Sequence, residues 1–97
     1  MTLRGLRVAQ TDAAEVEQTI RAVLHDVLGI DAARADAFTD SSGLFGTLPE
    51  LDSMAVAGLL TEIEDRLGII IDDDEVDGEM LGTFGALVTF AKAKALQ

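Results

Sequence analysis

Cysteine, tryptophan and tyrosine are absent from this chain of 97 residues, and histidine and proline each occur once, at His25 and Pro49. Without cysteine the protein can build no disulfide scaffold, thiolate metal site, cysteine nucleophile or iron–sulfur cluster. No apolar run approaches the roughly 20 residues that span a bilayer, and residues 1–10 lack the continuous apolar stretch of a signal peptide. We therefore expect a cytoplasmic protein without a membrane partner.

Basic residues are also scarce, with seven lysines and arginines against eighteen acids and a net charge of −11. This charge repels nucleic acids and anionic membranes and predicts a basic protein partner. Eleven of the acids lie between Glu50 and Glu79, where Arg66 is the only base. The charge pattern alone leaves two interpretations open, a partner-facing surface or a merely solvated one.

Apolar residues make up 48% of the chain, enough for one small hydrophobic core. Residues 1–10 show no helical period and are expected to form a mobile tail, followed by a helical domain over residues 11–97. The first helix is predicted to begin at Asp12, which can cap it together with Glu15, and to end at Gly29. Its apolar residues fall on one helical stripe: Val16, Ile20, Val23, Leu24, Val27 and Leu28.

A long loop is expected over residues 30–52, because this segment is rich in aspartate, serine and glycine. Loops of this length in a compact domain are usually functional or held by their own side chains. Five apolar residues are expected to anchor the loop over the core: Phe38, Leu44, Phe45, Leu48 and Leu51.

The second helix is predicted to open at Asp52-Ser53, with Asp52 as its N-cap, and to end at Gly68. Gly58 inside it costs about 1 kcal/mol relative to alanine, so tertiary packing must hold this helix. The isoleucines at residues 69–71 have no second strand to pair with. They are expected to form an extended connector that fills the core.

Two further helices complete the prediction. Residues 72–75, all acidic, are typical of the first turn of a short third helix, where the helix dipole favours negative charge. Thr83 is expected to cap the last helix, whose inner face carries Phe84, Leu87, Val88, Ala91 and Ala95. The predicted fold class is all-α, a small four-helix bundle of three main helices and the short third one, with a long loop between helices 1 and 2.

The chain offers no set of residues for catalysis or for a metal site. The G-x-S-x-G pattern of a nucleophilic serine is absent around Ser53, and His25 is expected on the surface of the first helix. The acids at residues 73–77 resemble the start of a calcium-binding loop, but Phe84 stands where the bidentate glutamate is needed. We therefore expect neither an enzyme nor a metal centre.

Ser53 is the remaining candidate for chemistry, because it opens a helix after the long loop. The unpaired N–H groups and the dipole of a helix N-terminus both favour an anion. From its position alone, Ser53 is either a helix cap or the attachment point of a phosphodiester.

The segment Glu50-Leu51-Asp52-Ser53-Met54 leads from the long loop into the predicted second helix. It resembles the Asp-Ser-(Leu or Met) signature that opens the second helix of acyl carrier proteins, here of the stand-alone bacterial type. Residues 68–74 are similar to the family's connector into its short third helix, and residues 83–87 to the start of its fourth. The resemblance covers residues 12–96.

The resemblance implies that Ser53, preceded by Asp52, carries a 4′-phosphopantetheine arm that a phosphopantetheinyl transferase moves from coenzyme A. The thiol of the arm would hold acyl groups as thioesters for acyl-loading and acyl-transferring enzymes with basic docking patches, and we expect the carrier to be a monomer. Partner recognition is implied for Met54, Glu62, Glu64 and Asp65. An acyl pocket is implied for Val56, Leu59, Leu60, Ile63 and Ile71, together with residues of the last helix.

Two departures from the family pattern favour a specialised biosynthetic pathway over general fatty acid synthesis. Glu50 stands where many carriers have glycine, and residues 55–58 contain no acid. Arg66 is expected to mask Glu64 and Asp65 in part, leaving Glu62 the freest acid of the helix. The alternative function is an unmodified acidic adaptor or regulatory domain that binds a basic protein, with Ser53 acting only as a helix cap.

Overall fold

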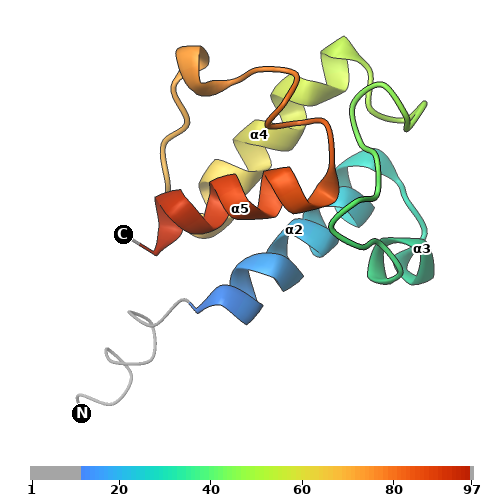
Figure 1. The fold of residues 1–97 in the computed structure, drawn as a ribbon, viewed down its shortest axis with the longest axis horizontal. Helices are drawn as coiled ribbons and strands as arrows, with labels where there is room; N and C mark the ends of the chain where they lie inside the picture. Colours follow the sequence, from blue (N-terminus) through green and yellow to red (C-terminus); the bar gives the residue numbers. More distant parts are fainter. Residues whose placement is uncertain (1–11, 97) are drawn as a thin grey trace.

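The computed structural model describes residues 12–96, and the predicted tail at residues 1–10 lies outside them. The elements are α2 (Ala13–Leu28), α3 (Ala32–Asp36), α4 (Ser53–Leu67), the single 3₁₀ turn η1 (Asp73–Glu75) and α5 (Phe84–Ala95). Helix α2 packs against α3, α4 and α5 (Figure 1). The all-α bundle is confirmed. No helix in residues 12–96 is long and apolar enough to cross a membrane.

The helices begin and end where local capping chemistry predicts. The Asp12 carboxylate accepts the Glu15 N–H at 2.8 Å and opens α2. Gly29 and Gly68 adopt the left-handed conformation, with φ of 71° and 65°, and end α2 and α4. The Thr83 hydroxyl accepts a backbone N–H from the first turn of α5 at 3.1 Å. These contacts satisfy backbone groups that a helix end leaves unpaired.

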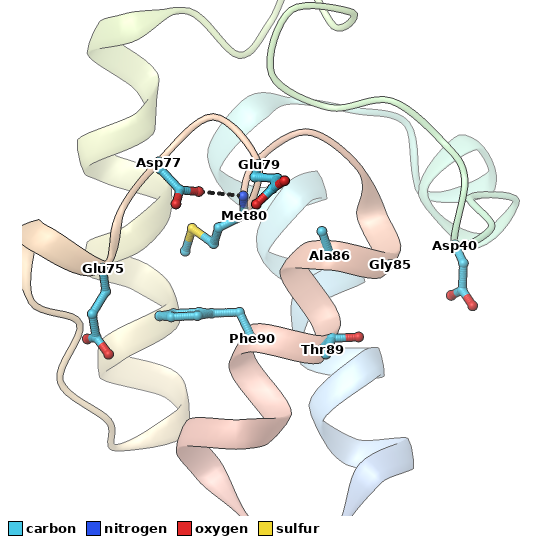
Figure 2. A pocket seen from close by; sticks show the side chains of 9 residues that line it. All are labelled: Asp40, Glu75, Asp77, Glu79, Met80, Gly85, Ala86, Thr89 and Phe90. Carbon is cyan, nitrogen blue, oxygen red and sulfur yellow. Dashed lines mark hydrogen bonds between the residues drawn. The ribbon is translucent and has the colours of Figure 1, made fainter.

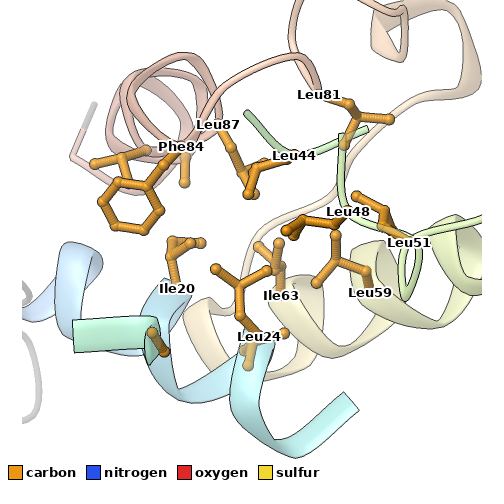
Figure 3. Packing of buried hydrophobic residues seen from close by; sticks show 14 of the residues in the cluster. Ile20, Leu24, Leu44, Leu48, Leu51, Leu59, Ile63, Leu81, Phe84 and Leu87 are labelled. Carbon is orange, nitrogen blue, oxygen red and sulfur yellow. The ribbon is translucent and has the colours of Figure 1, made fainter. Parts of the chain in front are cut away.

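The core lies between the three long helices and is closed by leucines of the loop (Figure 3). The stripe of α2 is buried at its first four positions, while Val27 and Leu28 are only partly buried. On α5, Ala95 is likewise only partly buried. The other buried core residues come from α3, α4, α5 and the segments between the helices: Ile30, Ala35, Leu44, Leu48, Leu51, Leu59, Ile63, Met80, Leu81, Phe84, Leu87, Val88 and Ala91.

The long loop differs from the prediction in two respects. It contains the short helix α3, which is capped by the Asp31 carboxylate accepting the Ala33 N–H at 3.1 Å. A helix of 5 residues is too short to show an apolar period, so the sequence pattern could not reveal it. Leu44, Leu48 and Leu51 are buried and Phe38 partly so, but Phe45 is 39% exposed and does not anchor the loop.

The structure also differs from the predictions made for the connector and for the third helix. Ile69 and Ile71 pack against the core, whereas Ile70 is 75% exposed. Side chains alternate in an extended segment, so three consecutive isoleucines cannot all point inward. The third helix is only the turn η1, held by reciprocal bonds between Asp72 and Glu75.

The loop before Ser53 is fastened to the start of α5. The N–H groups of Phe84 and Gly85 donate to the carbonyls of Ser42 and Asp40 at 2.8 and 2.9 Å. A Cβ atom on Gly85 would lie 2.7 Å from the Asp40 carbonyl oxygen, so glycine permits this close approach. Two more backbone bonds, each of 2.9 Å, run from Leu44 to Gly82 and from Phe45 to Leu81.

Candidate functional site

Asp52 and Ser53 open α4, and only Asp52 caps it. The Asp52 carboxylate accepts the Ala55 N–H at 2.8 Å, and its carbonyl accepts the Val56 N–H at 3.2 Å. The Ser53 side chain is exposed, and its hydroxyl makes no hydrogen bond to another residue of the described chain. Ser53 is therefore free for attachment of a group, and the cap that it was alternatively expected to form comes from its neighbour.

The start of α4 fits a covalently attached phosphate. The backbone N–H groups of Ser53 and Met54 belong to the first turn, where a helix has no internal partners for them, and none is found within residues 12–96. The positive end of the helix dipole lies at the same place. The exposed hydroxyl thus has open space around it, with hydrogen-bond donors and a favourable field for negative charge.

A shallow groove of about 460 Å³ adjoins Ser53. Its lining is a continuous loop segment followed by the first residue of α4: Phe45, Gly46, Thr47, Leu48, Pro49, Leu51, Asp52 and Ser53. Asp52 is the only charged residue among these, so the groove is suited to an uncharged, partly apolar ligand. The exposed ring of Phe45 lies at this groove instead of in the core.

The residues predicted for partner recognition differ in their exposure and in the hydrogen bonds that they form. Met54 is 87% exposed directly after Ser53, as expected of an apolar contact residue. Glu62 accepts a hydrogen bond from Arg66 Nε at 2.9 Å, and Arg66 Nη2 also donates to Asp26 at 2.7 Å. The bonds to Asp26 and Glu62 raise the pKa of the Arg66 guanidinium. The prediction that Glu62 is the freest acid is therefore wrong.

Glu64 and Asp65, which Arg66 was expected to mask, form no bond with it. The Glu64 carboxylate accepts the Ile71 N–H at 2.7 Å and so holds the connector against α4. Asp65 is exposed and forms no ion pair or hydrogen bond to another described residue. Asp65 is thus the acid of α4 that remains fully available to a partner.

The five residues predicted to line an acyl pocket pack in or against the core. Leu59 and Ile63 are 0% and 1% exposed. The other three, Val56, Leu60 and Ile71, are partly buried against the same cluster. None of them lines the Ser53 groove or a second cavity beside α5. An acyl chain could enter between them only if the helices moved apart, and the acyl pocket stays a prediction.

The second cavity, of about 680 Å³, lies between residues 75–80 and α5 and shares no lining residue with the Ser53 groove (Figure 2). Carboxylates surround its apolar side chains, Met80 and Phe90. An aliphatic chain here would take the Asp40 and Glu79 carboxylates, which form no ion pair within the described residues, out of water, so this cavity does not suit an acyl group. The acids that line it are Asp40, Glu75, Asp77 and Glu79. Sequence analysis missed the cavity, because Asp40 comes from the distant loop.

Two of these acids have structural partners. Glu75 accepts two hydrogen bonds from Lys94 Nζ, at 2.9 and 3.1 Å, which tie η1 to α5. This pair lowers the pKa of the Glu75 carboxyl and raises that of the Lys94 ammonium. Asp77 accepts the Met80 N–H at 2.8 Å.

Glu50 and His25 also have identifiable contacts. Arg34 of α3 donates to Glu50 at 2.9 Å and lowers the pKa of its carboxyl. Glu50 thereby joins α3 to the segment before Ser53. His25 is exposed on α2, as predicted, and its Nδ1 lies 2.7 Å from the Ile30 carbonyl oxygen.

Comparison with known proteins places this geometry in a family. The family model described as "phosphopantetheine attachment site" matches residues 18–91. The chain belongs to the acyl carrier protein family. The solution NMR structure of a holo acyl carrier protein from Nitrosomonas europaea is similar, with 38% sequence identity and a TM-score of 0.72. The match covers 80% of this chain and 92% of that chain. A search of curated protein sequences gave no match.

Membership of the acyl carrier protein family defines the general role of the chain. Its cofactor is a covalently attached 4′-phosphopantetheine, and its role is to carry acyl groups and not to catalyse a reaction. The free hydroxyl and unpaired N–H groups at the start of α4 are compatible with such an attachment.

Proposed function

We propose that this acyl carrier protein holds acyl or related carboxylic intermediates as thioesters on an arm joined to Ser53, and delivers them to enzymes of a fatty-acid-like or specialised pathway. The observation that carries the proposal is the exposed Ser53 hydroxyl, which has no structural role because Asp52 caps α4. The alternative, an unmodified adaptor in which Ser53 is the helix cap, loses its main support from the same contact.

The residues at the start of α4 have separate tasks in this proposal. Ser53 Oγ is the oxygen that would join the phosphate of the arm, and Asp52 holds the first turn in place beneath it. The free N–H groups of Ser53 and Met54 face the negative charge of that phosphate. The arm supplies the thiol that a chain without cysteine lacks.

Partner enzymes are proposed to dock on the exposed side of α4. Met54 would supply apolar contact beside Ser53, and Asp65 would supply the most available charge, with Glu62 and Glu64 adding negative potential. These contacts would serve the phosphopantetheinyl transferase and the acyl-loading enzymes. The exposed, uncharged residues Ala57 and Gly58 favour partners of a specialised pathway.

Incubation with coenzyme A and a broad-specificity phosphopantetheinyl transferase tests the attachment. The intact mass of the wild-type protein should rise by one phosphopantetheinyl group, and Ser53→Ala should show no rise. Ser41→Ala is a matched control, because Ser41 is also an exposed serine but lies in the loop; it should be modified like the wild type. A mass gain in Ser53→Ala would place the arm on another residue and contradict the proposal. No gain in the wild type with several transferases would favour the unmodified adaptor.

A further inference from the structure

The groove beside Ser53 contains one large apolar side chain that is not part of the core. It exposes part of the Phe45 ring, although burial of a phenylalanine is favourable and Leu44, its neighbour, is fully buried. The groove also ends at Ser53 itself, which is one of its lining residues. A group attached to Ser53 therefore starts at the edge of this groove.

We propose that the uncharged pantetheine part of the arm lies back along residues 45–51 and contacts the Phe45 ring, when no partner enzyme is bound. The inference rests on the proposed attachment to Ser53. It adds a binding site within the carrier for the arm itself, separate from the predicted acyl pocket.

The size and chemistry of the groove match such an occupant. Its volume of about 460 Å³ falls in the range of roughly 300–1,000 Å³ found for small-molecule sites. Phe45 and Pro49 offer apolar surface, while the Thr47 hydroxyl and the backbone at Gly46 offer polar groups for amides. The lining contains no cation, so the groove is less suited to a free anion or an acidic peptide.

Because the arm is tethered beside the groove, the groove needs much less affinity for it than for a free ligand. A group on a short flexible linker has an effective concentration of the order of millimolar at a neighbouring site. A contact with a dissociation constant of about 1 mM, which is negligible for a free ligand, would then be occupied about half of the time.

The groove is also formed in advance of any ligand. Four backbone hydrogen bonds hold residues 40–45 to residues 81–85, and Leu48 and Leu51 are buried in the core. The arm would therefore not have to order the loop as it binds, which lowers the entropic cost of the contact.

Amide ¹H–¹⁵N spectra of the modified and unmodified protein test the inference. We expect attachment to shift the amides of Gly46 and Thr47 as well as those at the start of α4, and the Phe45 ring protons to show nuclear Overhauser effects to the arm. Phe45→Ala should remove both effects, and Phe45→Leu should restore part of the shifts. Ile70→Ala is the control, because Ile70 is an exposed apolar residue that lines neither the groove nor the second cavity.

The thiol of the arm provides a second measurement. A half-occupied groove should make the thiol of the wild type react roughly twofold more slowly with a neutral thiol reagent than that of Phe45→Ala. Shifts confined to residues 52–55, with equal thiol rates, would overturn the inference and leave the groove to an apolar side chain of a partner. Mass spectrometry before each experiment separates this result from a failure of attachment.

Discussion

Asp52 and Ser53 are adjacent, yet the contacts of α4 divide structure and chemistry between them. The Asp52 carboxylate bonds to the backbone of the first turn at 2.8 Å, whereas the Ser53 hydroxyl makes no hydrogen bond within the described chain. A carrier needs its attachment residue to be accessible without the helix start becoming unstable. Placing the cap one residue earlier meets both requirements.

This division predicts different stabilities for two alanine variants. Asp52→Ala should lower the free energy of unfolding by about 1 kcal/mol, the usual loss when a helix N-cap is removed. Ser53→Ala should change it by less than about 0.5 kcal/mol, as for an exposed side chain without partners. Urea unfolding followed by circular dichroism measures both, and Asp52→Asn is the control, because asparagine caps as well as aspartate. An equal loss in the two alanine variants would mean that Ser53 also holds the helix.

At the scale of elements, the loop before Ser53 owes its position to α2, α3 and α5. Arg21 of α2 donates to the carbonyls of Ala35, Asp36 and Phe38 at 2.6, 3.1 and 3.1 Å. The same guanidinium lies 4.5 Å from the centre of the Phe84 ring of α5. Arg21 therefore holds α3 and the loop against the long helices, while Gly85 admits the loop backbone at the start of α5.

Two glycine-to-alanine variants should move stability in opposite directions. At Gly85 the new Cβ would lie within 3 Å of the Asp40 backbone, and we expect overpacking to cost about 1–3 kcal/mol. At Gly58 the nearest atom is Val27 Cγ1 at 3.8 Å, an ordinary contact. Gly58→Ala should therefore stabilise the protein by about 0.5–1 kcal/mol through better helix propensity.

Urea unfolding measures these two changes, and amide hydrogen exchange locates them. Gly85→Ala should speed exchange of the Leu44 and Phe45 amides, which donate to residues 81 and 82. Gly58→Ala should not speed the exchange of these two amides. If Gly85→Ala had the same free energy of unfolding as the wild type, the loop could move away from α5 without loss of stability.

The whole molecule carries far more negative charge than its ion pairs neutralise. Four basic side chains form ion pairs within residues 12–96: Arg21, Arg34, Arg66 and Lys94. Five of the eighteen acids take part, so most carboxylates form no ion pair within the described chain. The remaining negative potential can attract basic partners, and Asp65 is placed to direct that attraction to α4.

We expect Asp65→Lys to slow association with the phosphopantetheinyl transferase several-fold at low salt and to flatten its salt dependence, because charges at the rim of an interface act mainly on the association rate. The melting temperature should hardly change, since no described partner of Asp65 is lost. Asp36→Lys is the matched control: it changes the net charge equally, but Asp36 lies on α3. Stopped-flow binding at two ionic strengths measures both rates. An equal slowing in the two variants would mean that only net charge matters.

The sequence by itself determined the three long helices, most of their ends and the choice of Ser53 as the candidate site. Asp12, Thr83 and the C-terminal glycines act on backbone groups within a few residues, and buried stripes such as that of α2 repeat within one element. Such signals are local, so they can be recognised without knowing the neighbouring elements. The Asp52-Ser53 pair belongs to the same class of signal.

Only the tertiary structure decided which acids are free and where the grooves lie. Arg66 bonds to Asp26, 40 residues earlier in the chain, and Gly85 approaches Asp40 from another element. No period or capping motif encodes such contacts, and the expected masking of Glu64 and Asp65 was wrong for that reason. Phe45 and Ile70 were placed in the core for being apolar, but the backbone turns them outward. Burial of an apolar side chain is favourable. Whether the side chain is in fact buried depends on how the backbone packs against distant elements.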